Sequence, residues 1–126
     1  MQKIVGAPSV RRIVDLFFDA IEARDFEQAG RYLSPAQFFY FSPIESYDNA
    51  QDFIDAAGRV APITKRIERR RMFIDGEEVC IIYNFFTTMD ALASTRVAEW
   101  IKIKAGRIVS IEAFFDARAY ASMFDP

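Results

Sequence analysis

The period of the apolar pattern changes once along this chain, at Pro62, and this change limits the fold more than any other feature. Before Pro62 the apolar residues recur at helical spacing, and after it they alternate as they do in strands. Helices followed by long strands are typical of an α+β domain, in which the helices pack on one face of a curved antiparallel sheet. A twisted sheet wrapped around helices leaves a conical cavity, which is a natural ligand pocket.

The segment before Pro62 is expected to hold three helices, with a short aromatic strand between the second and the third. Ser9, Asp25 and Asp48 are the expected N-caps, because their side chains can accept a hydrogen bond from the free amides of a first helical turn. The predicted helices span about residues 9–24, 25–34 and 48–61, and the strand spans residues 37–42.

The segment after Pro62 is expected to hold four strands. Asp75-Gly76 is a hairpin signal, because a two-residue turn favours residues that accept positive φ, and Ala105-Gly106 predicts a second tight turn. The predicted strands span residues 65–74, 77–88, 95–104 and 107–115. The remaining segments are a loose arm over residues 1–8, a loop over residues 89–94 and a tail over residues 116–126.

The charge balance argues against two classes of partner. Sixteen basic and 18 acidic side chains give a net charge of -2, which provides no general attraction to nucleic acid or to an anionic membrane. The basic run over residues 65–71 is interleaved with apolar residues and favours an edge strand over a nucleic-acid site. The longest uncharged stretch, residues 32–44, is too short for a membrane helix of about 20 residues. We therefore expect neither nucleic acid nor a membrane as a partner.

The sequence contains no histidine and only one cysteine, Cys80. Without histidine there can be no Ser-His-Asp or Cys-His pair, so acid–base chemistry would fall to Asp, Glu, Tyr, Lys or Cys. The remaining ligands are too few for zinc, and we expect no metal and no other cofactor. A single cysteine precludes an intramolecular disulfide and suits a reducing, cytoplasmic location. Cys80 itself is expected to be a small core residue.

Glu99 is the strongest candidate for chemistry. Strand alternation groups it with three apolar residues, and paired strands must present their apolar sets to the same side. Glu99 should therefore face a pocket, where desolvation would raise its pKa and suit it to act as a general acid or base. The alternative is a buried Glu paired with an Arg or a Tyr that serves structure only. The grouped residues are Val97, Ile101 and Ile103 in one strand and Val109, Ile111, Ala113 and Phe115 in the last strand.

Four other polar side chains are candidates for the same pocket. Tyr40 and Ser42 share one face of the short first strand and could supply hydroxyl groups, although aromatic packing and a strand-end cap are the alternatives. Tyr83 and Asn84 lie on opposite faces of their strand, so only one of them can face the pocket.

Two stretches carry a family resemblance. VDLFFDAIEARDFEQAGRYLSP, residues 14–35, and RVAEWIKIKAGRIVSIEAFFD, residues 96–116, are similar to SnoaL-like proteins of the nuclear transport factor 2-like superfamily. The resemblance spans about residues 9–118, so we interpret residues 1–126 as a single domain. It implies a conical, cystatin-like fold and a homodimer formed through the outer sheet face, where Trp100 and Phe114 are expected beside Ala98.

The active sites known in that superfamily are incomplete in this sequence. The tyrosine of the ketosteroid isomerases corresponds to Phe17 and their base to Ser42, and only their later acid has a counterpart, in Glu99. The epoxide hydrolases use an Arg flanked by two Asp; Arg96 and Glu99 resemble part of that set, but Ala113 takes the place of the second acid. The site of the scytalone dehydratases depends on histidine, which this sequence lacks.

We therefore expect a protein that binds or transforms a small hydrophobic compound, cyclic or polyketide-like. If it is catalytic, it would be a cofactor-free isomerase, cyclase, hydrolase or lyase with Glu99 as the acid–base group. The alternative is a non-catalytic interaction or dimerisation module that uses the outer sheet face. The expected ligand-binding residues are Phe17, Tyr40, Ser42, Tyr83, Asn84, Ile111, Ala113 and Phe115.

Overall fold

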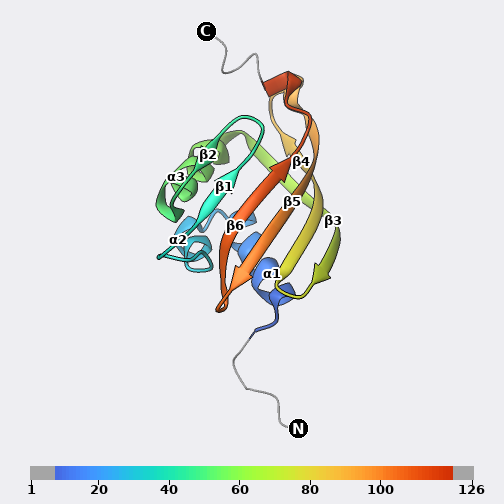
Figure 1. Cartoon of the computed structure of the whole chain (residues 1–126). Coiled ribbons are helices and arrows are strands. Elements are labelled where there is room, and N and C mark those ends of the chain that lie inside the picture. Colours follow the sequence, from blue (N-terminus) through green and yellow to red (C-terminus); the bar gives the residue numbers. More distant parts are fainter. Residues whose placement is uncertain (1–7, 121–126) are drawn as a thin grey trace.

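The order of the α-helices and strands in the computed structural model, which describes residues 8–120, follows the expected order except for one additional short strand (Figure 1). The arm before Pro8 and the tail beyond Tyr120 lie outside the described residues. The helical elements are α1 (Val10–Glu22), α2 (Phe26–Gly30), α3 (Ala50–Val60) and the 3-10 turns η1 (Ala61–Ile63) and η2 (Asp90–Leu92). The strands are β1 (Phe39–Phe41), β2 (Ser46–Tyr47), β3 (Thr64–Asp75), β4 (Glu78–Thr87), β5 (Ser94–Lys104) and β6 (Arg107–Phe114).

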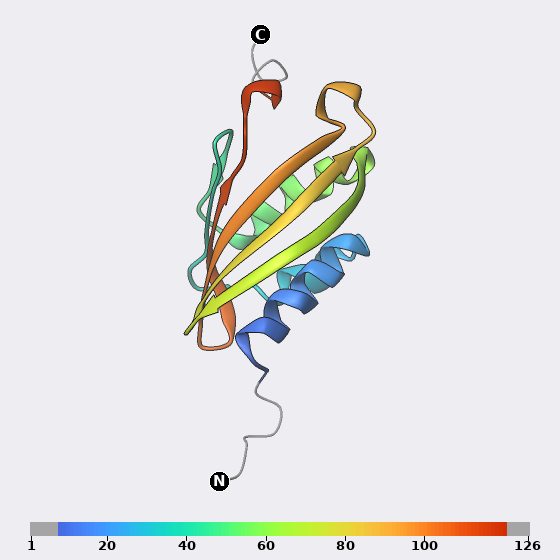
Figure 2. The ribbon, with the colours of Figure 1, turned by 90° about the vertical axis from the view of Figure 1, so that its right-hand side faces the viewer.

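The strands form one curved sheet in the order β2-β1-β6-β5-β4-β3, which does not close into a barrel. Figure 2 shows the helices gathered on one side of the long strands. The prediction of an antiparallel sheet is confirmed for β3 to β6 but is wrong at one position, because β1 runs parallel to β6. These two strands are separated by α3 and three long strands, so no hairpin turn fixes their relative direction. Strand β2 was not predicted.

Side-chain caps begin all three α-helices. The Ser9 hydroxyl accepts a hydrogen bond from the Arg12 amide at 3.1 Å, and an Asp25 carboxylate oxygen caps α2, as predicted. The cap of α3 is Asn49 rather than Asp48. Asn49 has extended backbone angles and accepts from the amide of the third helical residue at 2.8 Å. Both residues have side chains suited to capping, so the sequence pattern placed the start one residue too early.

The β3–β4 turn is also displaced by one residue from its prediction. Asp75 pairs with Glu78 inside the ladder, so the turn consists of Gly76 and Glu77. Positive φ is needed only at Gly76, where it is 61°. The predicted turn between β5 and β6 is confirmed, and both of its residues have positive φ, 53° and 77°, which are the φ signs of a type I′ turn.

The core lies between α1 and the inner face of β4, β5 and β6. Its largest fully buried side chains are Val14, Leu33, Val79, Ile81, Ile101, Ile108 and Ile111. The predicted inward set of the last strand needs one correction. Lys102 pairs with Ser110, but the next residue, Ile103, pairs with Ile108, so Val109 is an extra residue in a bulge. Ile108 therefore takes the buried position that had been expected for Val109.

The outer face of the sheet carries the aromatic side chains expected there. Trp100 and Phe114 are 39% and 49% exposed, and Ala98 lies directly opposite Phe114 in the ladder. The prediction for Cys80 is wrong. It pairs with Phe73 and Trp100 across the strands and is half-buried on this outer face, because the inward positions of β4 are the odd-numbered residues.

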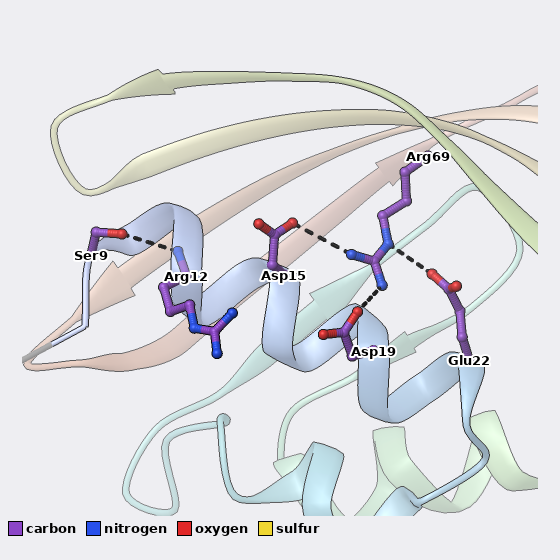
Figure 3. Close-up of polar contacts among 6 residues, drawn as sticks. All are labelled: Ser9, Arg12, Asp15, Asp19, Glu22 and Arg69. Atoms are coloured by element: carbon purple, nitrogen blue, oxygen red, sulfur yellow. Dashed lines mark hydrogen bonds and ion pairs between the residues drawn. The ribbon is translucent and has the colours of Figure 1, made fainter.

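Arg69 on edge strand β3 ties α1 to the sheet (Figure 3). Its guanidinium donates to Asp15 at 3.4 Å, to Asp19 at 2.6 Å and to Glu22 at 2.8 Å. The spacing of these acids places them on one stripe of the helix. The guanidinium also lies 5.5 Å from the centroid of the Phe18 ring, so the charged contact and the apolar packing act on the same helix.

Replacing Arg69 with methionine should lower the free energy of unfolding by about 1–2 kcal/mol, because three carboxylates on α1 lose their shared cation. Arg70→Met is the matched control. Arg70 is the extra residue of the register shift beside Arg69, and its ion pair, to Glu68 at 3.6 Å, is exposed. Urea unfolding at low ionic strength measures both variants. Equal losses in the two would contradict the assignment of a specific clamp.

No helix within residues 8–120 has the length and apolar character needed to cross a membrane.

Candidate ligand-binding site

A cavity of about 420 Å³ lies between the helices and the inner face of the sheet. Small-molecule sites in proteins typically enclose roughly 300–1,000 Å³. Aromatic side chains from the helices, β1, β4 and the C-terminal segment dominate its wall and leave the space unfilled. They are Phe17, Phe18, Phe26, Tyr40, Phe53, Tyr83, Phe85, Phe115 and Tyr120.

Glu99 extends from β5 into this aromatic wall and is 8% exposed. Its Oε2 accepts a hydrogen bond of 2.6 Å from the Tyr83 hydroxyl. Burial raises the pKa of Glu99 to about 7, and the hydrogen bond from Tyr83 offsets only part of this effect. The carboxyl group therefore exchanges its proton near neutral pH, which is the range that suits a general acid or base.

The second oxygen of Glu99 remains open to the cavity. Within the described residues, Oε1 of Glu99 has no hydrogen-bond partner. Every side-chain oxygen or nitrogen that is completely buried there does have a partner, so Oε1 is not completely buried. Oε1 must therefore be accessible from the cavity that Glu99 lines. Neither Arg nor Lys forms an ion pair with Glu99 in the part of the chain that the structure describes. The site thus combines a tyrosine-paired acid with adjacent open space.

Two tyrosines, Tyr83 and Tyr40, lie close enough to Glu99 to feel its charge. Burial raises the pKa of Tyr83 well above its usual value, and the charge of Glu99 adds to the shift. Burial and then Glu99 also raise the pKa of Tyr40, which lies on the inner side of β1. The Tyr40 ring stands 4.7 Å from that of Phe53 on α3. Both phenols are therefore neutral donors at physiological pH, held beside one carboxyl group.

The structure separates the predicted site residues into two groups. Phe17, Tyr40, Tyr83, Ala113 and Phe115 line the cavity together with Glu99. Ser42, Asn84 and Ile111 do not take part in the wall that the described residues form; Ile111 is instead packed in the core at 1% exposure.

The contacts of Ser42 and Asn84 explain their absence from the wall. The Ser42 hydroxyl accepts from the amides of Ile44 and Glu45 and so caps the end of β1. Asn84 lies on the outer face, where its amide donates to Glu68 at 2.9 Å and accepts from Arg96 Nε at 2.6 Å. Of the Tyr83–Asn84 pair, therefore, only Tyr83 faces the cavity. Arg96 is on the opposite side of the sheet from Glu99.

Several wall residues were not predicted. Phe85 could have been found, because it follows Tyr83 by two residues in the same strand. Phe53 and the rim residues Arg24, Glu45 and Lys65 come from segments that only the tertiary fold brings together. Among residues 8–120, no three side chains of Cys, Asp or Glu gather in a way that could hold a metal ion.

Comparison with known proteins identifies the fold and a family. The family model described as "Domain of unknown function (DUF8021)" matches residues 9–115. None of the curated proteins shows significant sequence similarity to the chain. Solved structures that resemble the chain include nuclear transport factor 2-like (NTF2-like) proteins, and the predicted nuclear transport factor 2-like fold is therefore confirmed.

Three of these structures show how far the similarity extends. An NTF2-like protein of unknown function from Cytophaga hutchinsonii has a TM-score of 0.78 and 20% identity, covering 99% of this chain and 100% of that one. A candidate polyketide cyclase from Sinorhizobium meliloti has a TM-score of 0.73 and 16% identity, and the match covers 80% of this chain and 92% of that one. An LEH-like epoxide hydrolase from M. tuberculosis has a TM-score of 0.75 and 16% identity, and the match covers 93% of this chain and 96% of that one. Identities this low describe the fold and not the activity.

Glu99 should make the protein less stable as the pH rises. Its pKa of about 7 in the folded state lies above the ordinary glutamate pKa of 4.5, so the folded state binds the proton more tightly. The penalty is absent below pH 4.5, grows between pH 4.5 and 7 and is complete above pH 7. Relative to Glu99→Gln, the wild type should lose about 2–3 kcal/mol between pH 5 and pH 8.

Urea unfolding across this pH range measures the difference. Glu112→Gln, on the outer face of β6, controls for the removal of one carboxylate. A constant difference between wild type and Glu99→Gln from pH 5 to pH 8 would show that the carboxyl group is not desolvated.

Proposed function

The chain belongs to the family described as "Domain of unknown function (DUF8021)", and for this member we propose that the aromatic cavity binds a small hydrophobic compound through Glu99 and Tyr40. The observation that carries the proposal is the open oxygen of Glu99, the one buried carboxyl group among the described residues of a wall rich in aromatic side chains. A ligand that displaces water from such a site must supply a partner for the polar group, because leaving the group unpaired in apolar surroundings is costly.

The chemistry of the wall defines the ligand. Flat aromatic surfaces suit a cyclic or polyketide-like body, and the protonated carboxyl group and the Tyr40 phenol can both donate to a neutral oxygen, such as a carbonyl. A ligand oxygen placed between the two donors would satisfy both.

A reaction at this site would use Glu99 as its acid–base group. Its pKa of about 7 allows the carboxyl group to give and take a proton at neutral pH, and Tyr83 holds the carboxylate in place. Isomerisation, cyclisation, hydrolysis and elimination can all proceed by proton transfer to and from such a group without a cofactor. The polyketide cyclase candidate and the epoxide hydrolase described above support the proposal only in that they have a similar fold.

A neutral fluorescent dye tests whether the cavity takes an apolar ligand. N-phenyl-1-naphthylamine should bind with increased emission, and Ala57→Phe should weaken binding at least tenfold, because Ala57 lines the cavity and the added ring fills it. Ala36→Phe, at an exposed position before β1, should bind the dye as the wild type does. Equal dye binding by the two variants would place the dye elsewhere and remove the support for a ligand cavity.

A second candidate function rests on the outer sheet face. Five large aromatic side chains are exposed there or at its margin: Phe39, Phe41, Phe73, Trp100 and Phe114. Exposed large aromatic side chains that gather on one face are enriched at interaction sites in soluble proteins. We propose that two copies of the chain form a dimer through this face. If the cavity holds no ligand, this dimerisation would be the function of the domain.

Light scattering at micromolar concentration should give the mass of a dimer. Trp100→Glu should shift the protein toward the monomer, since a charge would then be buried in the apolar contact. Arg11→Glu, on the exposed side of α1, is the control and should remain dimeric. A monomer mass for the wild type would rule out this interface.

A further inference from the structure

Two basic side chains stand at the rim of the cavity without a carboxylate partner among the described residues. Arg24 and Lys65 both line the cavity, from the end of α1 and the start of β3. Neither belongs to an ion pair among residues 8–120. These two residues bear on which ligands the proposed site would accept.

Arg24 occupies a backbone position that favours glycine. Its amide donates to the carbonyl of Ile21 at 3.0 Å, and the next amide, of Asp25, donates to Ala20 at 2.9 Å, which together form a Schellman motif at the end of α1. The φ of Arg24 is 61°, in the left-handed region that is unfavourable for residues with a side chain. Such exceptions are found preferentially at ligand sites, so the arginine side chain is a candidate for a role there.

The guanidinium is fixed at the rim but only partly used. Nη2 donates to the carbonyl of Ala61 at 3.1 Å and to that of Thr64 at 2.6 Å, and both of these residues also line the cavity. A guanidinium has five N–H donors in a rigid plane. Nε and Nη1 make no hydrogen bond within the described part of the chain, so three of the five N–H donors remain available at the rim.

Lys65 reaches the same rim through an irregularity of the sheet. Thr64 pairs with Thr87 and Arg66 with Phe86, so Lys65 is an extra residue that has no partner in the β3–β4 ladder. Bulges of this kind redirect a side chain. Lys65 is exposed and lines the cavity at the segment that Arg24 contacts.

The other charged residues of the rim have polar partners within the described residues, although the partner of Glu45 is a neutral hydroxyl and not a cation. Glu22 accepts from Arg69 at 2.8 Å, and Glu45 accepts from the Tyr47 hydroxyl at 2.6 Å. Arg66 lies 3.8 Å from Glu68, and its guanidinium stacks 4.1 Å from the Phe86 ring centroid. Arg24 and Lys65 are therefore the two basic side chains of the rim that have no carboxylate partner among the described residues, and Glu99 is the one buried carboxyl group in the wall that these residues form.

We propose that Arg24 and Lys65 bind the anionic group, a carboxylate or a similar compact oxyanion, of an amphipathic ligand whose apolar body occupies the cavity. This inference rests on the proposed function and adds a ligand class and an orientation to it. The anionic end stays at the rim, because Glu99 in the wall would repel it when ionised, and the neutral end meets Glu99 and Tyr40.

Two dyes with the same ring system test the inference. 8-Anilinonaphthalene-1-sulfonate carries an anionic group, and N-phenyl-1-naphthylamine lacks it. Arg24→Gln and Lys65→Gln should each weaken binding of the sulfonate dye by about fivefold and change that of the neutral dye by less than about twofold. Arg31→Gln, an exposed arginine of α2 outside the cavity wall, should leave both affinities unchanged. Added salt should weaken only the sulfonate dye.

The results with the two dyes separate a failure of the ligand cavity from a failure of the anion site. Failure of the wild type to bind the neutral dye would overturn the ligand cavity itself, and this inference with it. Neutral-dye binding with unchanged sulfonate affinity in both variants would overturn the inference alone. If Arg24→Gln weakens both dyes equally while Lys65→Gln weakens neither, Arg24 only holds the rim together through its two carbonyl contacts, and the anion site is refuted. Lys65→Gln keeps the test open if the Arg24 variant fails to fold.

Discussion

The antiparallel register of β4 and β5 decides which side chains enter the cavity. Ile81 stands opposite Glu99 and Tyr83 opposite Val97, so the Tyr83 hydroxyl reaches the Glu99 carboxylate diagonally across the inner face. A slip of one residue in one of the strands would turn its inward side chains to the outer face. The core and the polar part of the site thus depend on the same pairing, which makes the register hard to change without loss of both.

Glu99 lowers the stability of the fold that holds it. Desolvation raises its pKa, and the single hydrogen bond from Tyr83 does not restore the usual value. An apolar residue of similar size would avoid this penalty at neutral pH. Natural proteins tolerate such costs most often where a binding or catalytic role needs the group, which is why the open oxygen beside the cavity supports a functional reading of Glu99 over a purely structural one.

The sequence predicted those parts of the molecule that follow from local pattern. Alternation placed Glu99, Ala113 and Phe115 on the inner face, and the helix caps and turns were located to within one residue. Errors of one residue arose where neighbouring residues have equal propensity for the same role. The bulge at Val109 moved a buried position, and no local signal announces a bulge in an otherwise regular apolar strand.

Non-local contacts were beyond prediction from one sequence. The Arg69 clamp joins a strand to a helix more than 40 residues earlier, and the parallel pairing of β1 with β6 joins segments further apart. The cavity rim draws Arg24 and Lys65 from separate elements that lie together only after folding. Charges scattered along a sequence look like ordinary solvated residues, and their common location becomes visible only in three dimensions.

The central claim is that the Glu99 carboxyl group is desolvated at the edge of a cavity that admits an apolar ligand. Carbon-13 NMR of the labelled glutamate carboxyl groups tests it most directly, with Glu99→Gln identifying the signal. The account predicts a titration midpoint near 7 in the free protein. It also predicts a further upward shift when N-phenyl-1-naphthylamine displaces water from the cavity. A midpoint near the ordinary glutamate pKa of 4.5 that does not move when the dye is bound would contradict it.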